Sequence, residues 1–227
     1  MGTKPLLTEE ELSRVAQAVA AAEKETGGEI ATAIIAESDD YGFRELVFAI
    51  IVGVVVWTVT LGFPGPLEAL LNRLFWAWEP WVLAALQGVV GMLAGLIAYL
   101  VAQIPAVDRL IVPKAVMREA VTRRARRHFV DSGTYDTIDN TGILIFISLL
   151  ERRVELIADR GIHQQVDPGT WEPIVSALSR GIHEGHTADA LVEAVHACGE
   201  VLKGRVQPRA ENTNELANRP EELEKGS

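Results

Sequence analysis

Oxygen-bearing side chains gather where the expected strands of this chain begin and end. Residues 29–37, 141–149 and 154–158 are the expected strands. Calcium and magnesium take several oxygen ligands from loops, and α/β sheets bind ligands at the carboxyl ends of their strands. We therefore predict a calcium or magnesium site formed by Asp136, Asp139, Asn140, Asp159 and Asp39. The competing interpretation is that these are ordinary turn and helix-cap residues.

A phosphatase centre is the second chemistry to weigh. It would need a nucleophile or a metal-activated water, together with a cation for the phosphate. Asp159 and Arg160, with His163 nearby, could be arranged in this way. An exposed Asp-Arg-Gly turn is the simpler interpretation.

Histidines and the single cysteine give a third grouping. His183 and His186, with His196 further on, invite a zinc hypothesis. The spacing is not H-E-x-x-H, and Gly185 is expected to end the helix between the first two, so solvated histidines at helix ends are favoured. Cys198 lies among apolar helix positions and is expected in the core.

Two long uncharged stretches, residues 46–63 and 81–104, dominate the middle of the chain. About 20 helical residues cross a hydrocarbon core of about 30 Å, so we predict a transmembrane hairpin. The alternative is a pair of buried core helices, which a domain this small could not surround. Gly88, Gly91 and Gly95 share one helix face and are expected to pack against the other helix, with Gly53 as their partner.

Aromatic and basic residues flank the two stretches. Tryptophans favour the water–lipid boundary, so Trp76, Trp78 and Trp81 are expected at the membrane interface, where residues 67–78 could form a short interfacial helix. Basic residues concentrate after the second stretch, and among them Arg109, Arg123 and Arg124 are expected at the lipid surface. The positive-inside rule then places both termini in the cytoplasm and the linker between the two stretches outside. An exposed face of the helix over 113–131 is a compatible alternative.

Composition limits the remaining classes of function. The formal net charge is −10, which argues against nucleic acid as a partner. A single cysteine permits no internal disulfide, and the acidic N-terminal residues are not those of a signal peptide.

The elements around the hairpin predict one discontinuous domain. Thr8 and Glu11 form a capping box before a helix that Gly27 and Gly28 end. After the hairpin come the helix over 113–131, two strands, and helices over 171–184 and 187–203. We predict a three-layer α/β/α sandwich with a small mixed sheet and an inserted two-helix transmembrane hairpin. The expected parts are 1–45 and 113–203 for the soluble domain, 46–112 for the hairpin, and 204–227 for a disordered tail.

Short motifs recur in a familiar order along the soluble part. A helix ends in Glu23-Lys-Glu-Thr26-Gly-Gly-Glu29-Ile30, a strand opens with Asn140-Thr-Gly142, and the charged turn Glu151-Arg-Arg precedes a strand that leads to Gly161-Ile162. In this order the motifs resemble the TPM domain family, over residues 7–37, 128–162 and 171–202.

The resemblance implies a TPM-like fold and a modest set of functions. Members of that family accompany membrane complexes. Examples of such members are photosystem II repair factors and an auxiliary subunit of an acetylcholine receptor. Some bind calcium, and weak acid phosphatase activity is ascribed to others. This chain departs from the usual member, in which a membrane anchor follows an exported domain, because here a hairpin interrupts the domain after its first strand. It looks like the bacterial membrane branch of the family, which implies a location in the inner membrane of a bacterial cell with both termini in the cytoplasm.

We therefore expect an accessory or adaptor module that contacts the lipid bilayer and another membrane protein, with catalysis the less favoured outcome. The alternative is a metal-dependent phosphatase at the inner membrane surface. The glycine face permits a homo-oligomer. A transporter is not favoured, because two helices without an intramembrane charge offer no pathway.

Overall fold

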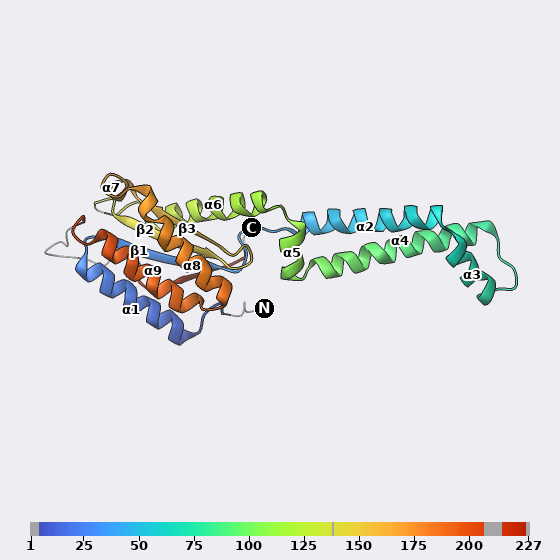
Figure 1. The fold of residues 1–227 in the computed structure, drawn as a ribbon, viewed down its shortest axis with the longest axis horizontal. Helices are drawn as coiled ribbons and strands as arrows, with labels where there is room; N and C mark the ends of the chain where they lie inside the picture. The colour runs from blue at the N-terminus through green and yellow to red at the C-terminus, as the bar shows by residue number, and fades with distance from the viewer. Residues whose placement is uncertain (1–4, 138, 207–214, 226–227) are drawn as a thin grey trace. The chain divides into compact units, whose positions relative to one another are not determined.

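The computed structural model describes residues 5–137, 139–206 and 215–225. The chain divides into two compact units (Figure 1): Met1–Asp39 with Ala115–Ser227, and Asp40–Lys114. The expected boundaries at 45/46 and 112/113 differ from these by a few residues. We call the first the soluble unit and the second the hairpin unit.

A mixed four-stranded sheet forms the centre of the soluble unit. Its strands are β1 (Glu29–Ile35), β2 (Gly142–Ser148), β3 (Arg153–Ala158) and β4 (Glu221–Leu223), in the order β3-β2-β1-β4. β1 runs parallel to both β2 and β4, and β2 and β3 form an antiparallel pair. Every residue of β1 and β2 is buried, which explains their continuous runs of isoleucine, alanine and leucine.

Helices cover both faces of this sheet (Figure 1). On one face lie α1 (Glu9–Glu25), α8 (Glu172–Glu184) and α9 (Thr187–Leu202), whose Val15, Val19 and Leu191 join Ile34 and Ile145 in one core. On the other face lies α6 (Lys114–Asp131), whose Val121 and Ala125 pack with Ala33 and Phe146. The predicted three-layer α/β/α arrangement is confirmed. Two short helical segments, α7 (Arg160–His163) and η1 (Pro168–Thr170), link β3 to α8.

The N-terminus of α1 has the predicted capping box. The Glu11 amide donates to Thr8 Oγ1 at 3.2 Å, and the Thr8 amide donates to Glu11 Oε2 at 2.7 Å. The hydrogen bond from the Thr8 backbone holds the pKa of Glu11 below its ordinary value. The cap therefore satisfies donors that the first helical turn would otherwise leave without partners.

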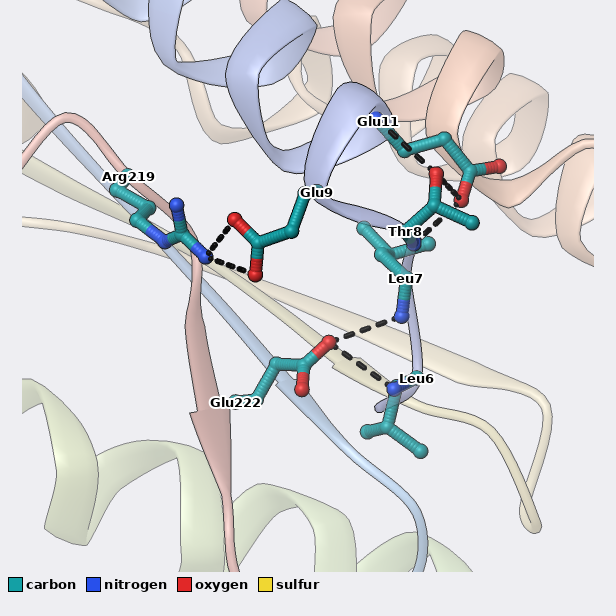
Figure 2. Close-up of polar contacts among 7 residues, drawn as sticks. All are labelled: Leu6, Leu7, Thr8, Glu9, Glu11, Arg219 and Glu222. Atoms are coloured by element: carbon teal, nitrogen blue, oxygen red, sulfur yellow. Dashed lines mark hydrogen bonds and ion pairs between the residues drawn. The ribbon is translucent and has the colours of Figure 1, made fainter. Parts of the chain in front are cut away.

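The C-terminal segment differs from the expectation of a disordered tail over 204–227. Residues 221–223 form β4 on the free edge of β1, while 207–214 lie outside the described residues. Glu222 Oε1 accepts hydrogen bonds from the amides of Leu6 and Leu7 at 3.0 and 2.9 Å, and Arg219 pairs with Glu9 at 2.9 Å (Figure 2). The expectation was wrong here because the segment is held by backbone and ionic contacts rather than by the apolar periodicity that sequence patterns detect.

All regular secondary structure in the hairpin unit is helical. It contains α2 (Gly42–Gly62), α3 (Gly65–Leu74), α4 (Pro80–Ala102) and α5 (Pro105–Ile111), and α2 packs along α4. Among the described residues, α2 and α4 are the two helices long and apolar enough to cross a membrane. Most of their surface is not covered by other parts of the chain, and the exposed side chains include Ile50, Val54, Leu96 and Leu100. Neither helix is therefore a buried core helix within this chain.

Candidate functional site

Three regions carry the polar or close-packed residues of interest. The first is the end of the sheet where β1 and β2 terminate. Ser38 and Ser148 are buried with their hydroxyl oxygens 2.7 Å apart. The Ser38 amide donates to Glu151 Oε1 at 3.0 Å, and the Ser148 hydroxyl donates to Glu151 Oε2. The sequence indicated only a charged turn at Glu151, yet its buried carboxylate connects the ends of two strands.

A small basic pocket lies beside this network. Its volume is about 100 Å³, and it is lined by Ser38, Asp39, Arg123, Arg124 and Arg127. The Arg123 guanidinium pairs with Asp39 Oδ2 at 2.6 Å. Arg124 Nε is buried and has no hydrogen-bond partner among the described residues. The pocket thus joins the arginines expected at a lipid surface to the Asp39 expected in a metal site.

The positive charge of Arg124 also acts on the next turn of α6. Burial lowers the pKa of His128 below its ordinary value, and Arg124 adds to this effect, while Glu221 and Asp131 oppose it. His128 is buried, and its Nε2 lies 3.7 Å from Glu221 Oε2. The histidine is therefore mainly neutral near pH 7 and adds no charge to the basic surface.

The second region is the opposite end of the sheet, where β2 begins. The amide of Asp159 donates to the Gly142 carbonyl at 2.9 Å, and the Gly161 amide donates to the Asn140 carbonyl at 3.0 Å. A Cβ on Gly161 would stand 2.6 Å from the carbonyl oxygen of Asp139 and 2.7 Å from that of Asn140, so only glycine permits this approach. Residues from before β2 and after β3 therefore meet here.

The carboxylate of Asp159 has one satisfied and one unsatisfied oxygen. Its Oδ1 accepts from the Arg160 amide at 2.6 Å as the cap of α7. Its Oδ2 is buried without a hydrogen-bond partner among the described residues. Such an atom costs roughly 1–3 kcal/mol unless a donor or a cation completes it.

The predicted cation site is not assembled as one group of five residues. In the parallel pair, Glu29 lies opposite Gly142 and Ile35 opposite Ser148. Asp39 follows β1 and so lies about 20 Å, one strand length, from the start of β2. Asp39 therefore cannot join Asp136, Asp139, Asn140 and Asp159. Across the described residues, no three His, Cys, Asp or Glu side chains are arranged to hold a metal ion.

The Glu-x-x-Thr-x-x-Glu motif has a structural place in the fold. Glu23 Oε1 accepts from the Ile30 amide at 3.0 Å, and the Thr26 hydroxyl donates to the Ala22 carbonyl at 3.1 Å. Glu29 Oε2 accepts from the Leu216 amide at 3.3 Å. Burial, opposed by the Ile30 amide and reinforced by the charge of Glu29, raises the pKa of Glu23 to about 7. The motif joins α1, β1 and the C-terminal segment.

The histidine and cysteine positions lie apart from these regions. Gly185, with φ of 85°, ends α8, so His183 lies in α8 while His186 stands before α9. His183 Nδ1 lies 2.7 Å from the Ser179 carbonyl oxygen. Cys198 is buried in the core, and burial raises the pKa of its thiol to about 12. At neutral pH this thiol is protonated and shielded from solvent.

The third region is the contact between α2 and α4. A Cβ on Gly91 would stand 2.8 Å from Trp57 Cβ, and a Cβ on Gly95 would stand 3.1 Å from the Ala49 carbonyl oxygen. Gly53 faces both glycines. A Cβ on Gly88 would meet nothing within 4 Å. Gly88 was expected in this contact and does not take part in it. Gln87 Nε2 also crosses between the helices, donating to the Thr60 carbonyl at 2.8 Å.

An apolar groove of about 510 Å³ runs along the same helix pair. Four glycines and several large side chains line it. The glycines are Gly53, Gly88, Gly91 and Gly95, and the large side chains include Leu46, Ile50, Val54, Trp57, Met92, Leu96 and Tyr99. Gly91 and Gly95 therefore pack against α2, whereas Gly88 lines the groove at a point where its own Cβ would meet no atom of α2.

The expected interface residues lie at and beyond the ends of these helices. Trp76 and Trp78 lie between α3 and α4, and Trp81 lies in the first turn of α4. Trp76 and Trp81 are exposed, and Trp78 Nε1 donates to Asn72 Oδ1 at 2.8 Å. Arg109 lies in α5.

Comparisons with known proteins give one structural likeness. A scan of family models and a search of curated proteins return no match. The NMR structure of BA42 protein from the psychrophilic bacterium Bizionia argentinensis is similar to this chain with a TM-score of 0.57. The two chains are 16% identical, and the likeness covers 98% of this chain and 99% of that one. At this identity the likeness shows the fold alone, and the chain has a fold similar to that of BA42 protein.

Proposed function

We propose that this chain is an integral membrane protein of the bacterial inner membrane and an accessory module of a membrane protein complex. The observation that carries the proposal is the surface of α2 and α4. Large apolar side chains such as Ile50, Val54, Leu96 and Leu100 are about half exposed or more. In water this surface would be costly, at roughly 25 cal/mol per Å² of apolar area. A lipid bilayer removes that cost and matches helices of 21 and 23 residues.

The distribution of arginines supports a cytoplasmic soluble unit. Arg109 follows α4, and α6 carries Arg123, Arg124 and further basic residues, whereas α3 in the linker between α2 and α4 carries only Arg73. Basic residues near membrane segments are retained on the cytoplasmic side. Both termini then lie in the cytoplasm, and the soluble unit acts there as a TPM-like module, in keeping with the resemblance of its motifs.

The glycine-lined groove supports a helical partner within the membrane. Small residues allow two helix backbones to approach closely, which is the main source of helix association in lipid. A Cβ on Gly88 would meet nothing within 4 Å, and the groove that Gly88 lines is mainly apolar. The partner is a transmembrane helix of another membrane protein, with a second copy of this chain as the alternative occupant.

Crosslinking in native membranes, followed by mass spectrometry, tests the accessory role. A stoichiometric partner crosslinked to the hairpin or the soluble unit is the expected result, and a protein that crosslinks only to itself would redirect the proposal to a homo-oligomer. A protein that purifies alone and monomeric would contradict it. Reporters fused after residue 227 and inserted in the 75–79 segment test topology separately, because only the first should be active in the cytoplasm.

A divalent-cation function has one specific observation in its favour. Asp159 Oδ2 is buried without a hydrogen-bond partner among the described residues, at the place where Asn140 and Asp139 approach Gly161. Calcium or magnesium could complete this oxygen, with water molecules as the remaining ligands, since no three carboxylate side chains of the described residues surround one point. A metal-dependent phosphatase at the inner membrane surface would build on the same site. NMR titration with each ion should shift the Asp159 and Asn140 signals, and signals that do not move would remove both ideas.

A further inference from the structure

The basic pocket of the soluble unit has an excess of positive charge. Arg123, Arg124 and Arg127 line it together with one carboxylate, Asp39. Asp39 Oδ2 pairs with the Arg123 guanidinium at 2.6 Å. Two guanidinium charges are therefore left over, from Arg124 and Arg127, which an anion of matching charge would balance.

Arg124 gives a second and independent indication. Its Nε is buried, and no hydrogen-bond acceptor reaches it among the described residues. A buried donor without an acceptor costs roughly 1–3 kcal/mol, so such donors are normally completed by protein, water or a ligand. Because Arg124 lines the pocket, a small movement of its side chain would bring this donor to an acceptor that enters from outside the chain.

The size and chemistry of the pocket select a phosphate group. Its volume of about 100 Å³ is well above the roughly 10–15 Å³ that a single water needs and suits a small tetrahedral anion. Guanidinium groups bind phosphate with two parallel hydrogen bonds, which a lysine could not supply. A phosphomonoester carries about −1.5 to −2 charges at pH 7, which matches the excess of Arg124 and Arg127.

We propose that Arg124 and Arg127, together with Arg123, form a binding site for a phosphate group. The pocket lies at the carboxyl end of β1, beside the Ser38–Ser148–Glu151 network that fixes the ends of β1 and β2. Carboxyl ends of parallel strands are the usual place for ligands in such sheets. The phosphate belongs either to an anionic lipid headgroup or to a small phosphorylated solute. The site does not depend on the accessory role proposed above.

The test uses the full-length protein in two environments. In dodecyl maltoside micelles, which contain no phosphate, glycerol phosphate and inorganic phosphate are titrated by calorimetry. In nanodiscs, phosphatidylcholine is compared with phosphatidic acid while hydrogen exchange is followed over residues 38–39 and 123–127. Saturable binding in micelles identifies a solute site. Protection that appears only with phosphatidic acid, without saturable binding in micelles, identifies a headgroup site.

Matched arginine variants decide whether the pocket is responsible. Arg124→Gln and Arg127→Gln should each weaken binding by about tenfold or more, the loss of one charge-assisted contact. Arg126→Gln changes the same charge on the adjacent position, which does not line the pocket, and should stay within about twofold. If Arg124→Gln fails to fold, the exposed Arg127 carries the test. Equal losses in all three variants, or neither binding nor protection in either environment, would overturn the site.

Discussion

Gly53 of α2 and Gly91 of α4 lie backbone against backbone, and a Cβ on either residue would stand 3.0 Å from the carbonyl oxygen of the other. The obstacle is main chain on both sides, so neither helix can yield by turning a side chain. The contact between α2 and α4 therefore depends on residues without a side chain at these two positions.

Enlarging one of these glycines should separate the helices. Gly91→Leu places new atoms against Trp57 Cβ and the Gly53 carbonyl, and overpacking of this kind costs about 1–3 kcal/mol. Thermal unfolding in detergent should occur at a lower temperature, and hydrogen exchange in α2 and α4 should accelerate. Gly62→Leu is the control, because a Cβ there meets nothing within 4 Å. Equal stability of the Gly91 and Gly62 variants would contradict the contact.

Blocking the groove without disturbing the hairpin should release the transmembrane partner proposed above. Gly88→Leu fills the groove floor, yet a Cβ at Gly88 touches nothing within 4 Å. The variant should fold like the native protein and lose most of its partner in crosslinking or co-purification. Gly62→Leu, outside the groove lining, should retain the partner. A Gly88 variant that keeps its full partner complement would show that the groove is not the docking surface.

The pKa of Glu23 predicts how stability depends on pH. Its value of about 7 in the folded protein is above the ordinary 4.5, so the folded state holds the proton more tightly than the unfolded state. Its contribution is therefore fully present below pH 4.5 and is lost as pH rises through about 7, by an amount on the order of 2–3 kcal/mol. Glu23→Gln should flatten this part of the curve in denaturant unfolding followed by circular dichroism.

Glu25 provides the matched control for that experiment. It lies two residues away in α1, is exposed, and has a pKa lowered by the hydrogen bond and charge of Lys203. Its titration therefore falls below the window in which Glu23 acts, and Glu25→Gln should keep the decline between pH 4.5 and 7. If the Glu23 and Glu25 variants show the same slope as the native protein, another group is responsible.

The contacts of the C-terminal strand should make a measurable contribution to stability. Glu222→Ala removes the acceptor for the Leu6 and Leu7 amides and should lower the free energy of unfolding by about 1–2 kcal/mol. Glu222→Gln keeps a carbonyl oxygen and should lose less. The exposed neighbour Glu224 serves as the control, since Glu224→Ala leaves these bonds in place. Proteolysis rates of the C-terminal segment give an independent measurement.

The parts of the fold that followed from sequence are those with strong local patterns. The isoleucine-rich runs of β1 and β2, the Thr8 cap and the two uncharged helices each carry a signal within a few neighbouring residues. β4 has no such signal, because Glu221–Leu223 pairs with residues almost two hundred positions earlier in the chain. The local composition therefore indicated only that this segment is polar, and did not predict a strand.

In the candidate sites, too, the features missed from sequence are those that join distant parts of the chain. The sequence grouped Asp39 with Asp159 because both follow strands, but β3 runs antiparallel to β2, so its end lies at the start of β2. Strand direction is a property of the whole sheet and cannot be taken from spacing. The link between Ser38, Ser148 and Glu151 was missed for a similar reason, since it joins two strand ends 110 positions apart.

The hairpin interrupts the sequence of the soluble unit, and this determines the order in which the strands are synthesised. β1 leaves the ribosome first, but both of its neighbours, β2 and β4, are encoded after the two apolar helices. At about 5–20 residues per second, roughly 5–20 seconds separate the completion of β1 from that of β2. During this interval the nascent strand EIATAII has neither edge covered, so the soluble unit cannot close until both apolar helices have been synthesised.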